Sequence, residues 1–370
     1  MAERVWYGHG RAVSVVRTAL APAALLFRAA TATRGALYDR GVLHARPLGA
    51  PSLGVGNLTV GGTGKTPVAA WACAELRQRG AHPALLMRGV GGDEAQVHAL
   101  LNPGMPVVSD PDRVRGAAGA AALGANCLVL DDAFQHRRAR RDVDFVLISA
   151  EQFELTRVHL LPAGPYREGL NALSRAAVAV VTRKSAPPKT ATAAADALAR
   201  YVRAGAVAVV HLAAAGLRRW PGDVLDAPGA GSMQASQGAD THELDTLRAA
   251  PTLVVAGVGN PEAFAAQLAD VGARVELARY PDHHAYTEAD AARLAERAAR
   301  GGPELRVVTT LKDAVKLGPR WPRGAPPLWY VSQRVTVERG GGLLAAHLDA
   351  IAAAARVPFP RPPVADALQP

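Results

Sequence analysis

Short apolar runs alternate along the chain with glycine-rich turns and with segments whose apolar residues recur at helical spacing. The first such unit predicts a buried strand over residues 51–58, a glycine loop, and a helix over residues 67–79. Val68, Ala72 and Leu76 place apolar side chains on one face of that helix. Further strands are predicted over residues 84–87, 127–130, 145–148 and 177–181, with a further helix over 114–123. This alternation predicts an α/β fold whose parallel sheet is covered by helices on both faces.

The alternation stops once and then begins again, which indicates a second domain. Residues 221–250 are rich in Gly, Pro, Ser and Asp and lack periodicity, so we interpret them as a linker or long surface loop. Beyond it, strands are predicted over 252–256, 274–277 and 306–310 and helices over 261–271 and 288–299. The length of 370 residues also favours two domains. The predicted ranges are an N-terminal region over 1–45, a first domain over 46–220, a smaller C-terminal α/β domain over 251–356 and a proline-rich tail over 357–370.

The N-terminal region combines an apolar stretch with many arginines. The first fifty residues hold seven Arg against Glu3 and Asp39. The apolar run over residues 18–27 is shorter than the roughly 20 residues that span a bilayer. One face of a helical wheel collects apolar side chains, namely Val13, Val16, Leu20, Ala24 and Phe27. The pattern predicts a helix, kinked before Pro22, that lies on an anionic membrane surface; the alternative is a helix that packs on the body of the protein.

The chain is strongly basic, with a formal net charge of +10. This charge indicates an acidic partner, such as nucleic acid, anionic lipid or a phosphorylated substrate, or simply an arginine-rich composition. Residues 136–141 hold four Arg without interleaved aromatics, which favours contact with solvent or anionic lipid over nucleic acid. Because only five of the 42 basic residues are lysines, each lysine marks a candidate position for a compact ammonium group. The lysines are Lys65, Lys184, Lys189, Lys312 and Lys316.

The two cysteines, Cys73 and Cys127, lie far apart in apolar runs. They lack the spacing of metal ligands, so each is predicted to be a buried free thiol. Free thiols fit a reducing cytoplasm.

The segment between the first predicted strand and helix has the composition of a phosphate-binding loop. It consists of Thr59, Val60, Gly61, Gly62, Thr63, Gly64, Lys65 and Thr66. The strict pattern has Gly at the first position, where this chain has Thr59. Glycines let backbone N–H groups approach phosphate oxygens, Lys65 would reach the β- and γ-phosphates, and the Thr66 hydroxyl would ligate Mg²⁺. The alternative is a glycine-rich turn with a chance Gly-Lys-Thr.

Asp131 and Asp132 directly follow the apolar strand predicted over 127–130. A carboxylate at that end of a strand, beside a phosphate loop, is where a nucleotide-binding domain holds Mg²⁺. The alternative is a pair of acids that cap the next segment. With the loop nearby, the metal-binding interpretation is favoured.

Several further motifs make the chain resemble the tetraacyldisaccharide 4′-kinase family, the lipid A 4′-kinases of Gram-negative bacteria. The matching segments are residues 37–41 (LYDRG), 56–67 (GNLTVGGTGKTP), 131–136 (DDAFQH), 160–168 (LLPAGPYRE), 257–261 (GVGNP), 281–287 (PDHHAYT) and 312–316 (KDAVK). The resemblance implies a P-loop NTPase domain, a smaller C-terminal α/β domain and an N-terminal helix on the cytoplasmic face of the inner membrane. It also implies MgATP as phosphoryl donor and a tetraacyl glucosamine disaccharide 1-phosphate as acceptor, phosphorylated at its 4′-hydroxyl.

The resemblance implies a catalytic pair, which falls on Asp93 in Gly92-Asp93-Glu94-Ala95 and on His283. A carboxylate can take the proton of an attacking sugar hydroxyl, and a histidine can orient it or share the proton. Lys65 would neutralise phosphate charge. Four other residues in family motifs are expected near the phosphates or the metal with unassigned roles: Gln135, His136, Arg167 and Glu168.

The chain departs from the family pattern at a few positions. Ala133 replaces a Gly after the two acids, which predicts the loss of a position free to take positive φ. Val90 replaces a Tyr, Ala95 replaces a Pro, and the excursion that the family has before its Gly-Asp-Glu motif is missing. Leu311 replaces a Glu before the Lys312-Asp313 pair. These changes predict a trimmed lobe around Asp93.

A different class of function shares the phosphate loop: a P-loop ATPase or GTPase switch, such as a metallochaperone, without a lipid substrate. The guanine-binding Asn-Lys-x-Asp motif and a Cys/His metal motif are absent from the sequence. A non-catalytic nucleotide-binding protein of the membrane surface is a third possibility. For the kinase interpretation we expect no nucleic acid and no obligate protein partner.

Overall fold

The computed structural model describes residues 2–8, 10–89, 93–220, 241–259 and 261–356. The chain divides into two units: the first holds residues 1–90, 105–212 and 335–370, and the second holds 91–104 and 213–334. The division therefore does not follow the contiguous ranges expected from the sequence. Residues 91–104 belong to the second unit because their helix, over Asp93–Leu101, packs on the helix over Leu311–Leu317. The C-terminal helix, over Gly341–Ala354, belongs to the first unit because it packs on the helix over Lys65–Gln78.

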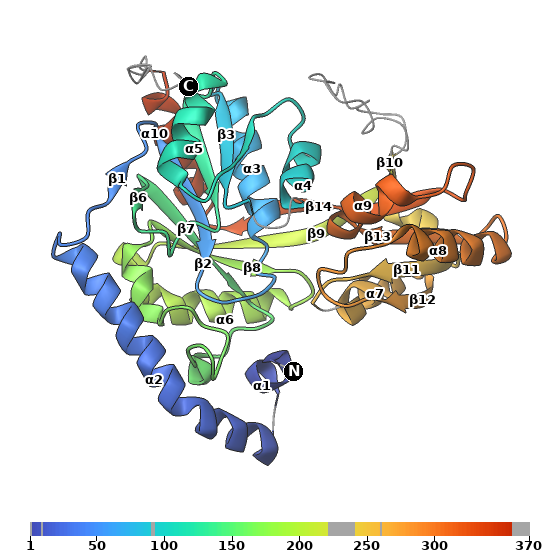
Figure 1. Cartoon of the computed structure of the whole chain (residues 1–370), viewed down its shortest axis with the longest axis horizontal. Helices are drawn as coiled ribbons and strands as arrows, with labels where there is room; N and C mark the ends of the chain where they lie inside the picture. Colours follow the sequence, from blue (N-terminus) through green and yellow to red (C-terminus); the bar gives the residue numbers. More distant parts are fainter. Residues whose placement is uncertain (1, 9, 90–92, 221–240, 260, 357–370) are drawn as a thin grey trace, which may run out of the picture. The chain divides into compact units, whose positions relative to one another are not determined.

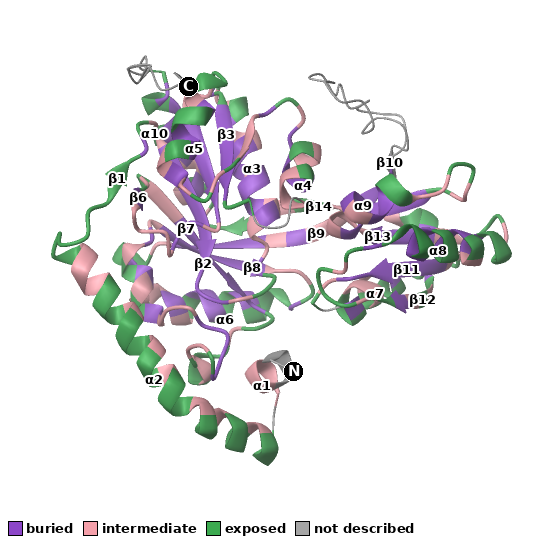
Figure 2. Ribbon diagram, in the orientation of Figure 1, coloured by how far each residue is buried: buried purple, intermediate pink, exposed green. Residues whose placement is uncertain are grey.

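The first unit is built on a parallel sheet with the strand order β9-β8-β7-β2-β5-β3-β4 (Figure 1). Its strands are β2 (Ser52–Asn57), β3 (Pro83–Met87), β4 (Val107–Ser109), β5 (Cys127–Asp131), β7 (Val143–Ser149), β8 (Val178–Arg183) and the first part of β9 (Val207–Arg219). A separate short parallel pair joins β1 (Arg46–Pro47) to β6 (Ala139–Arg140). The residues of β2, β3 and β5 are all buried, as the purple strands of Figure 2 show, because helices cover both faces of the sheet.

Four helices supply that cover: α3 (Lys65–Gln78), α5 (Arg113–Ala122), α6 (Pro188–Leu198) and α10 (Gly341–Ala354). The register of the strands places Leu86, Leu130 and Val146 on one face, where they pack with residues of α5 and α6. The other face meets α10 at Phe145, whose ring lies 6.1 Å from that of His347, and α10 packs on α3. The predicted α/β fold with a covered parallel sheet is confirmed, and α3 begins two residues before the predicted start at 67.

The second unit has a sheet of the order β12-β11-β13-β14-β9. The strands are β11 (Pro251–Ala256), β12 (Arg274–Arg279), β13 (Arg306–Thr310) and β14 (Leu328–Arg339), with β10 (Thr241–His242) antiparallel to β9. The helices are α4 (Asp93–Leu101), α7 (Pro261–Asp270), α8 (Glu288–Arg300) and α9 (Leu311–Leu317). The capping box that Thr287 and Asp290 form at the start of α8 explains why the predicted helix begins there.

Parts of two predicted segments lie outside the described residues. These are residues 221–240 of the predicted linker and the tail over 357–370. The end of the linker is structured, because β10 is followed by a 3₁₀ turn over Leu244–Leu247. Both cysteines are buried and free, as predicted, and burial raises the pKa of Cys127 to about 12.

The N-terminal region forms α1 (Ala2–Tyr7) and α2 (Arg11–Asp39). α2 is 29 residues long, continues through Pro22 and has no buried residue (Figure 2). By length and composition alone it is apolar and long enough to cross a membrane, so the estimate from the run over 18–27 was too short. One face of the helix is half-buried, at Val13, Leu20, Ala24 and Phe27, whereas Val16 is exposed. Near the C-terminal end of the helix, Asp39 forms an ion pair of 2.6 Å with Arg137.

α1 is fastened to α2 and to the first unit by side chains. The Arg17 guanidinium donates to the carbonyls of Val5 and Trp6, at 2.8 and 2.7 Å. The Trp6 indole N–H donates to the carbonyl of Pro162 at 3.0 Å. The Tyr7 hydroxyl lies 3.9 Å from the point where a Cβ on Gly61 would stand. α1 therefore adjoins the glycine loop within the first unit.

Candidate functional site

The predicted phosphate loop connects β2 to α3 and has the backbone that such a loop requires. Gly61 has φ 119° and Gly64 has φ 84°, conformations that glycine adopts without steric cost. Gly64 is also the N-cap of α3, so the loop delivers the chain directly to the positive end of that helix. Lys65 is the first residue of α3 and Thr66 the second. The loop and its helix thus present backbone N–H groups and an ammonium at one place.

Side chains from neighbouring strands hold the loop in shape. The Asn57 amide donates to the Thr63 hydroxyl at 2.9 Å, and the Thr182 hydroxyl donates to the Thr63 carbonyl at 2.9 Å. The Lys184 ammonium donates to the Gly62 carbonyl at 3.0 Å. Lys184, which follows β8, was not predicted as a site residue. The only indication in the sequence was that lysine is rare in this chain. It places a second ammonium at the loop.

The two acids occupy different environments at the end of β5. Asp131 is buried as the last residue of the strand. The Asp132 carboxylate lies 3.8 Å from the Lys65 ammonium and accepts hydrogen bonds of 2.9 and 3.0 Å from Arg167. Asp132 has a positive φ of 51°, whereas Ala133, at the position of the family's Gly, does not and is a buried residue of the core. Asp has a short polar side chain that tolerates this conformation, so Ala133 loses no required freedom.

Of the four residues expected near the site, Gln135 and Arg167 join the cluster around Asp132. The Gln135 side-chain amide donates to the Asn57 backbone carbonyl at 2.9 Å, and Arg167 donates to the side-chain Oε1 of Gln135 at 3.4 Å. Burial lowers the pKa of His136, and nearby arginines lower it further, so both favour the neutral imidazole. Glu168 instead forms an ion pair of 2.8 Å with Arg175.

Arg113, at the start of α5, is a charged residue that sequence analysis missed. It is 2% exposed, and its guanidinium donates to the Asp110 carbonyl at 3.1 Å. Burial lowers the pKa of Arg113, whereas the charges of Asp132 and Asp131 favour its ionised form. In the sequence, Arg113 is one of many arginines and begins an alanine-rich helix. No neighbouring residue indicates that its side chain is buried near Asp131 and Asp132.

The basic segment over 136–141 is not a free solvated face. Within the described residues, Arg138 pairs with Asp112 at 3.2 Å and Arg141 pairs with Asp144 at 3.0 Å. Arg137 is the residue that pairs with Asp39 of α2. The segment therefore mainly neutralises local carboxylates.

Asp93 and His283 belong to the second unit, whereas the phosphate loop belongs to the first. Asp93 begins α4, and its carboxylate lies 3.6 Å from the Lys316 ammonium. His283 is exposed and has φ 57°, an uncommon conformation for a residue with a side chain. Within the described part of the chain, no hydrogen bond or ion pair joins Asp93 to His283. The trimmed segment before Asp93 includes residues 90–92, which lie outside the described residues.

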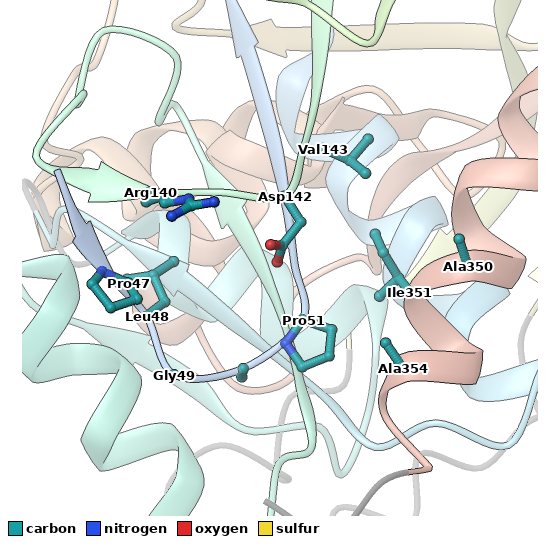
Figure 3. Close-up of a pocket in the computed structure, with 11 residues that line it drawn as sticks. Pro47, Leu48, Gly49, Pro51, Arg140, Asp142, Val143, Ala350, Ile351 and Ala354 are labelled. Atoms are coloured by element: carbon teal, nitrogen blue, oxygen red, sulfur yellow. The ribbon is translucent and has the colours of Figure 1, made fainter. Parts of the chain in front are cut away.

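A cavity of about 500 Å³ lies elsewhere in the first unit, between the segment over 47–51 and α10 (Figure 3). Its walls are mostly apolar, with Arg140 and Asp142 as the charged members. The Asp142 carboxylate accepts hydrogen bonds from the amide and the hydroxyl of Ser52, at 2.8 and 2.9 Å. None of the predicted site residues is among those that line this cavity, so it is separate from the phosphate loop.

Comparison with solved structures supports the fold. LpxK from Aquifex aeolicus, crystallised in complex with ATP, superposes with a TM-score of 0.69. The match covers 91% of this chain and 99% of that one, at 24% sequence identity. At this identity the likeness concerns the fold.

Comparison with sequences identifies the family. The tetraacyldisaccharide 4′-kinase of Anaeromyxobacter sp. strain Fw109-5 is 38% identical over 378 residues, which cover 95% of this chain and 96% of the relative. The protein of the same name from Halorhodospira halophila is 35% identical over 347 residues, covering 89% and 91%. The family model described as tetraacyldisaccharide-1-P 4′-kinase matches residues 16–352. The chain therefore belongs to the tetraacyldisaccharide 4′-kinase family.

Proposed function

We propose that this chain transfers the γ-phosphoryl group of ATP to the 4′-hydroxyl of a tetraacyl glucosamine disaccharide 1-phosphate, giving lipid IVA in lipid A biosynthesis. Membership of the kinase family supports the reaction. The observation that carries the residue-level proposal is the glycine loop that leads into α3, with Lys65 3.8 Å from Asp132. This arrangement has the parts that a phosphoryl-transfer enzyme uses: amide donors, an ammonium and a carboxylate.

Residues 59–66 would hold the triphosphate of ATP. The N–H groups of the loop and the start of α3 suit anionic oxygens, and Lys65 would reach the β- and γ-phosphates. The family's relative from Aquifex aeolicus was crystallised with ATP. Arg167 and Lys184 lie beside the loop and add positive charge there.

Thr66, Asp131 and Asp132 would hold Mg²⁺. Their donor set fits this ion, because Mg²⁺ prefers hard oxygen ligands and is usually bound through one or two carboxylates together with substrate phosphates. Asp132 adjoins Lys65, whose neighbour in the chain is Thr66. When bound, Mg²⁺ would neutralise charge on the phosphates. Asp132 and Lys65 would then keep the phosphates and the ion at the mouth of the loop.

Asp93 would accept the proton of the 4′-hydroxyl as that oxygen attacks, and His283 would orient the carboxylate or share the proton. The Asp93 side chain is 14% exposed and is the first side chain of α4. His283 is exposed on a turn, where its φ is 57°. Both groups are therefore available to a substrate.

The cytoplasmic face of the inner membrane is the proposed location, because the acceptor is a membrane lipid and α2 is an exposed apolar helix. Deletion of residues 1–30 should weaken binding to vesicles that contain anionic lipid. Unchanged partitioning of the shortened protein would show that α2 has a structural role instead.

The test of the function is transfer of radiolabelled phosphate from ATP to a tetraacyl disaccharide 1-phosphate in detergent. We expect a labelled lipid product that needs both ATP and Mg²⁺. The P-loop switch alternative predicts nucleotide hydrolysis that does not depend on the lipid. Hydrolysis of ATP or GTP at the same rate without the lipid acceptor, and no labelled lipid, would overturn the proposal in favour of that alternative.

A further inference from the structure

Two of the five lysines lie on the short helix α9, and both face acids at the start of α4. The Lys316 ammonium lies 3.6 Å from the Asp93 carboxylate, and the Lys312 ammonium lies 3.8 Å from the Glu94 carboxylate. The two pairs differ in burial. Lys316 and Asp93 are 15% and 14% exposed, whereas Lys312 and Glu94 are 40% and 36% exposed. Because screening by water is weaker at the less exposed pair, Lys316 is the stronger restraint on its partner.

The same helix also reaches the backbone that carries His283. Asp313 is fully buried, and its carboxylate accepts a hydrogen bond of 3.1 Å from the Gly257 amide. The Gly257 carbonyl in turn accepts a hydrogen bond of 3.1 Å from the His283 amide. Gly257 is thus held through both its amide and its carbonyl. The hydrogen bond to its carbonyl keeps His283 in the left-handed conformation.

Two further groups adjoin the Asp313 carboxylate. The Thr310 hydroxyl donates to it at 2.8 Å, and the buried ring of Tyr286 brings its hydroxyl beside it. A Cβ on Gly257 would stand 3.0 Å from both Asp313 Oδ1 and the Tyr286 hydroxyl. Such close packing leaves the turn little room to shift.

We propose that α9 is a brace that positions both members of the catalytic pair: Lys316 holds the Asp93 carboxylate directly, and Asp313 holds His283 through Gly257. The proposal rests on the proposed function for the roles of Asp93 and His283. Residues 313 and 316 are three positions apart, so they lie on neighbouring points of one helix face. Lys316 and Asp313 are positioning residues, because each acts through another group.

The first test compares Lys316→Met with Lys312→Met, which removes the ammonium of the more exposed pair on the same helix. For Lys316→Met we expect kcat for lipid phosphorylation to fall about tenfold to a hundredfold, because a misplaced catalytic group costs rates of this order. The KM for ATP should not change, since the phosphate loop is untouched. Lys316→Arg should recover part of kcat, and Lys312→Met should retain the wild-type kcat. Equal losses in the two methionine variants would overturn the proposal.

A double variant separates positioning from general stability. If Lys316 acts through Asp93, then Asp93→Asn combined with Lys316→Met should be no slower than Asp93→Asn alone. Multiplied losses in the double variant would show that Lys316 contributes independently, which contradicts the brace.

Amide hydrogen exchange tests the brace without relying on the reaction. Lys316→Met should speed exchange in α4, and Asp313→Asn should speed exchange at His283, with Lys312→Met as the unchanged control. Unaltered exchange in the first two variants would overturn the brace. Absence of lipid phosphorylation by the wild-type protein would overturn the proposed function, and the exchange result would still decide the brace.

Discussion

The phosphate loop and the Asp93–His283 region are built in opposite ways. The loop is one continuous stretch whose backbone N–H groups would do most of the proposed phosphate binding, and its shape is set by Gly61 and Gly64. The second region gathers single side chains from the start of α4, from the turn after β12 and from α9. The first arrangement is encoded by eight consecutive residues, whereas the second depends on how segments far apart in the sequence pack together. The two regions should therefore respond differently to substitution.

The largest effect is expected in the loop. Lys65→Ala should lower kcat/KM for phosphate transfer by about a thousandfold, because a pre-positioned charge that stabilises the phosphates is lost. Lys189→Ala, on the exposed start of α6, is the matched control and should behave as wild type. Full activity in Lys65→Ala would remove the loop from the mechanism.

In the second region, Asp93→Ala should lower kcat by about a hundredfold while the affinity for ATP stays the same. Loss of the proposed base would slow the chemical step without touching the proposed phosphate loop. Single-turnover rates and ATP titrations would separate the two effects. A change confined to ATP affinity would show that Asp93 is not the base.

A backbone change in the loop should have an intermediate effect. Gly64→Ala forces a side chain into φ 84°, which costs roughly 1–2 kcal/mol, so ATP should bind about tenfold more weakly. The new Cβ would also meet the end of the Leu212 side chain. Gly119→Ala, inside α5 and with open space around it, should instead raise the melting temperature slightly. Wild-type ATP affinity in Gly64→Ala would mean that the loop does not need this conformation.

The smallest effect concerns pH. The pKa of His136 in the folded protein lies below its usual value near 6.5, chiefly through burial. The unfolded chain therefore binds this proton more readily, and stability should be lost as the pH falls below about 6.5. Chemical denaturation at several pH values should show a shallower loss for His136→Gln than for wild type. Identical pH dependence would exclude His136 as a contributor.

The contrast also explains which features the sequence could reveal. The central strands were predictable because each is a short apolar run between turn residues, and the loop was predictable because its chemistry is local. Lys184 and Arg113 were missed because their proximity to the loop and to Asp132 arises only when separate strands and helices meet. The positive φ of Asp132 was not predicted, because the backbone conformation of a single turn residue leaves no trace in composition. The ranges of the two units were not predicted, because residues 91–104 belong to the second unit although the residues before and after them in the chain belong to the first.

The position of α1 has a thermodynamic consequence. Its Tyr7 hydroxyl stands beside Gly61, and its Trp6 indole donates a hydrogen bond to Pro162, so the segment that precedes the apolar helix borders the proposed phosphate loop. If attachment to lipid displaces α1 and thereby alters ATP affinity by some factor, occupancy by ATP must alter lipid attachment by the same factor. Nucleotide-dependent partitioning between solution and vesicles would measure that reciprocity.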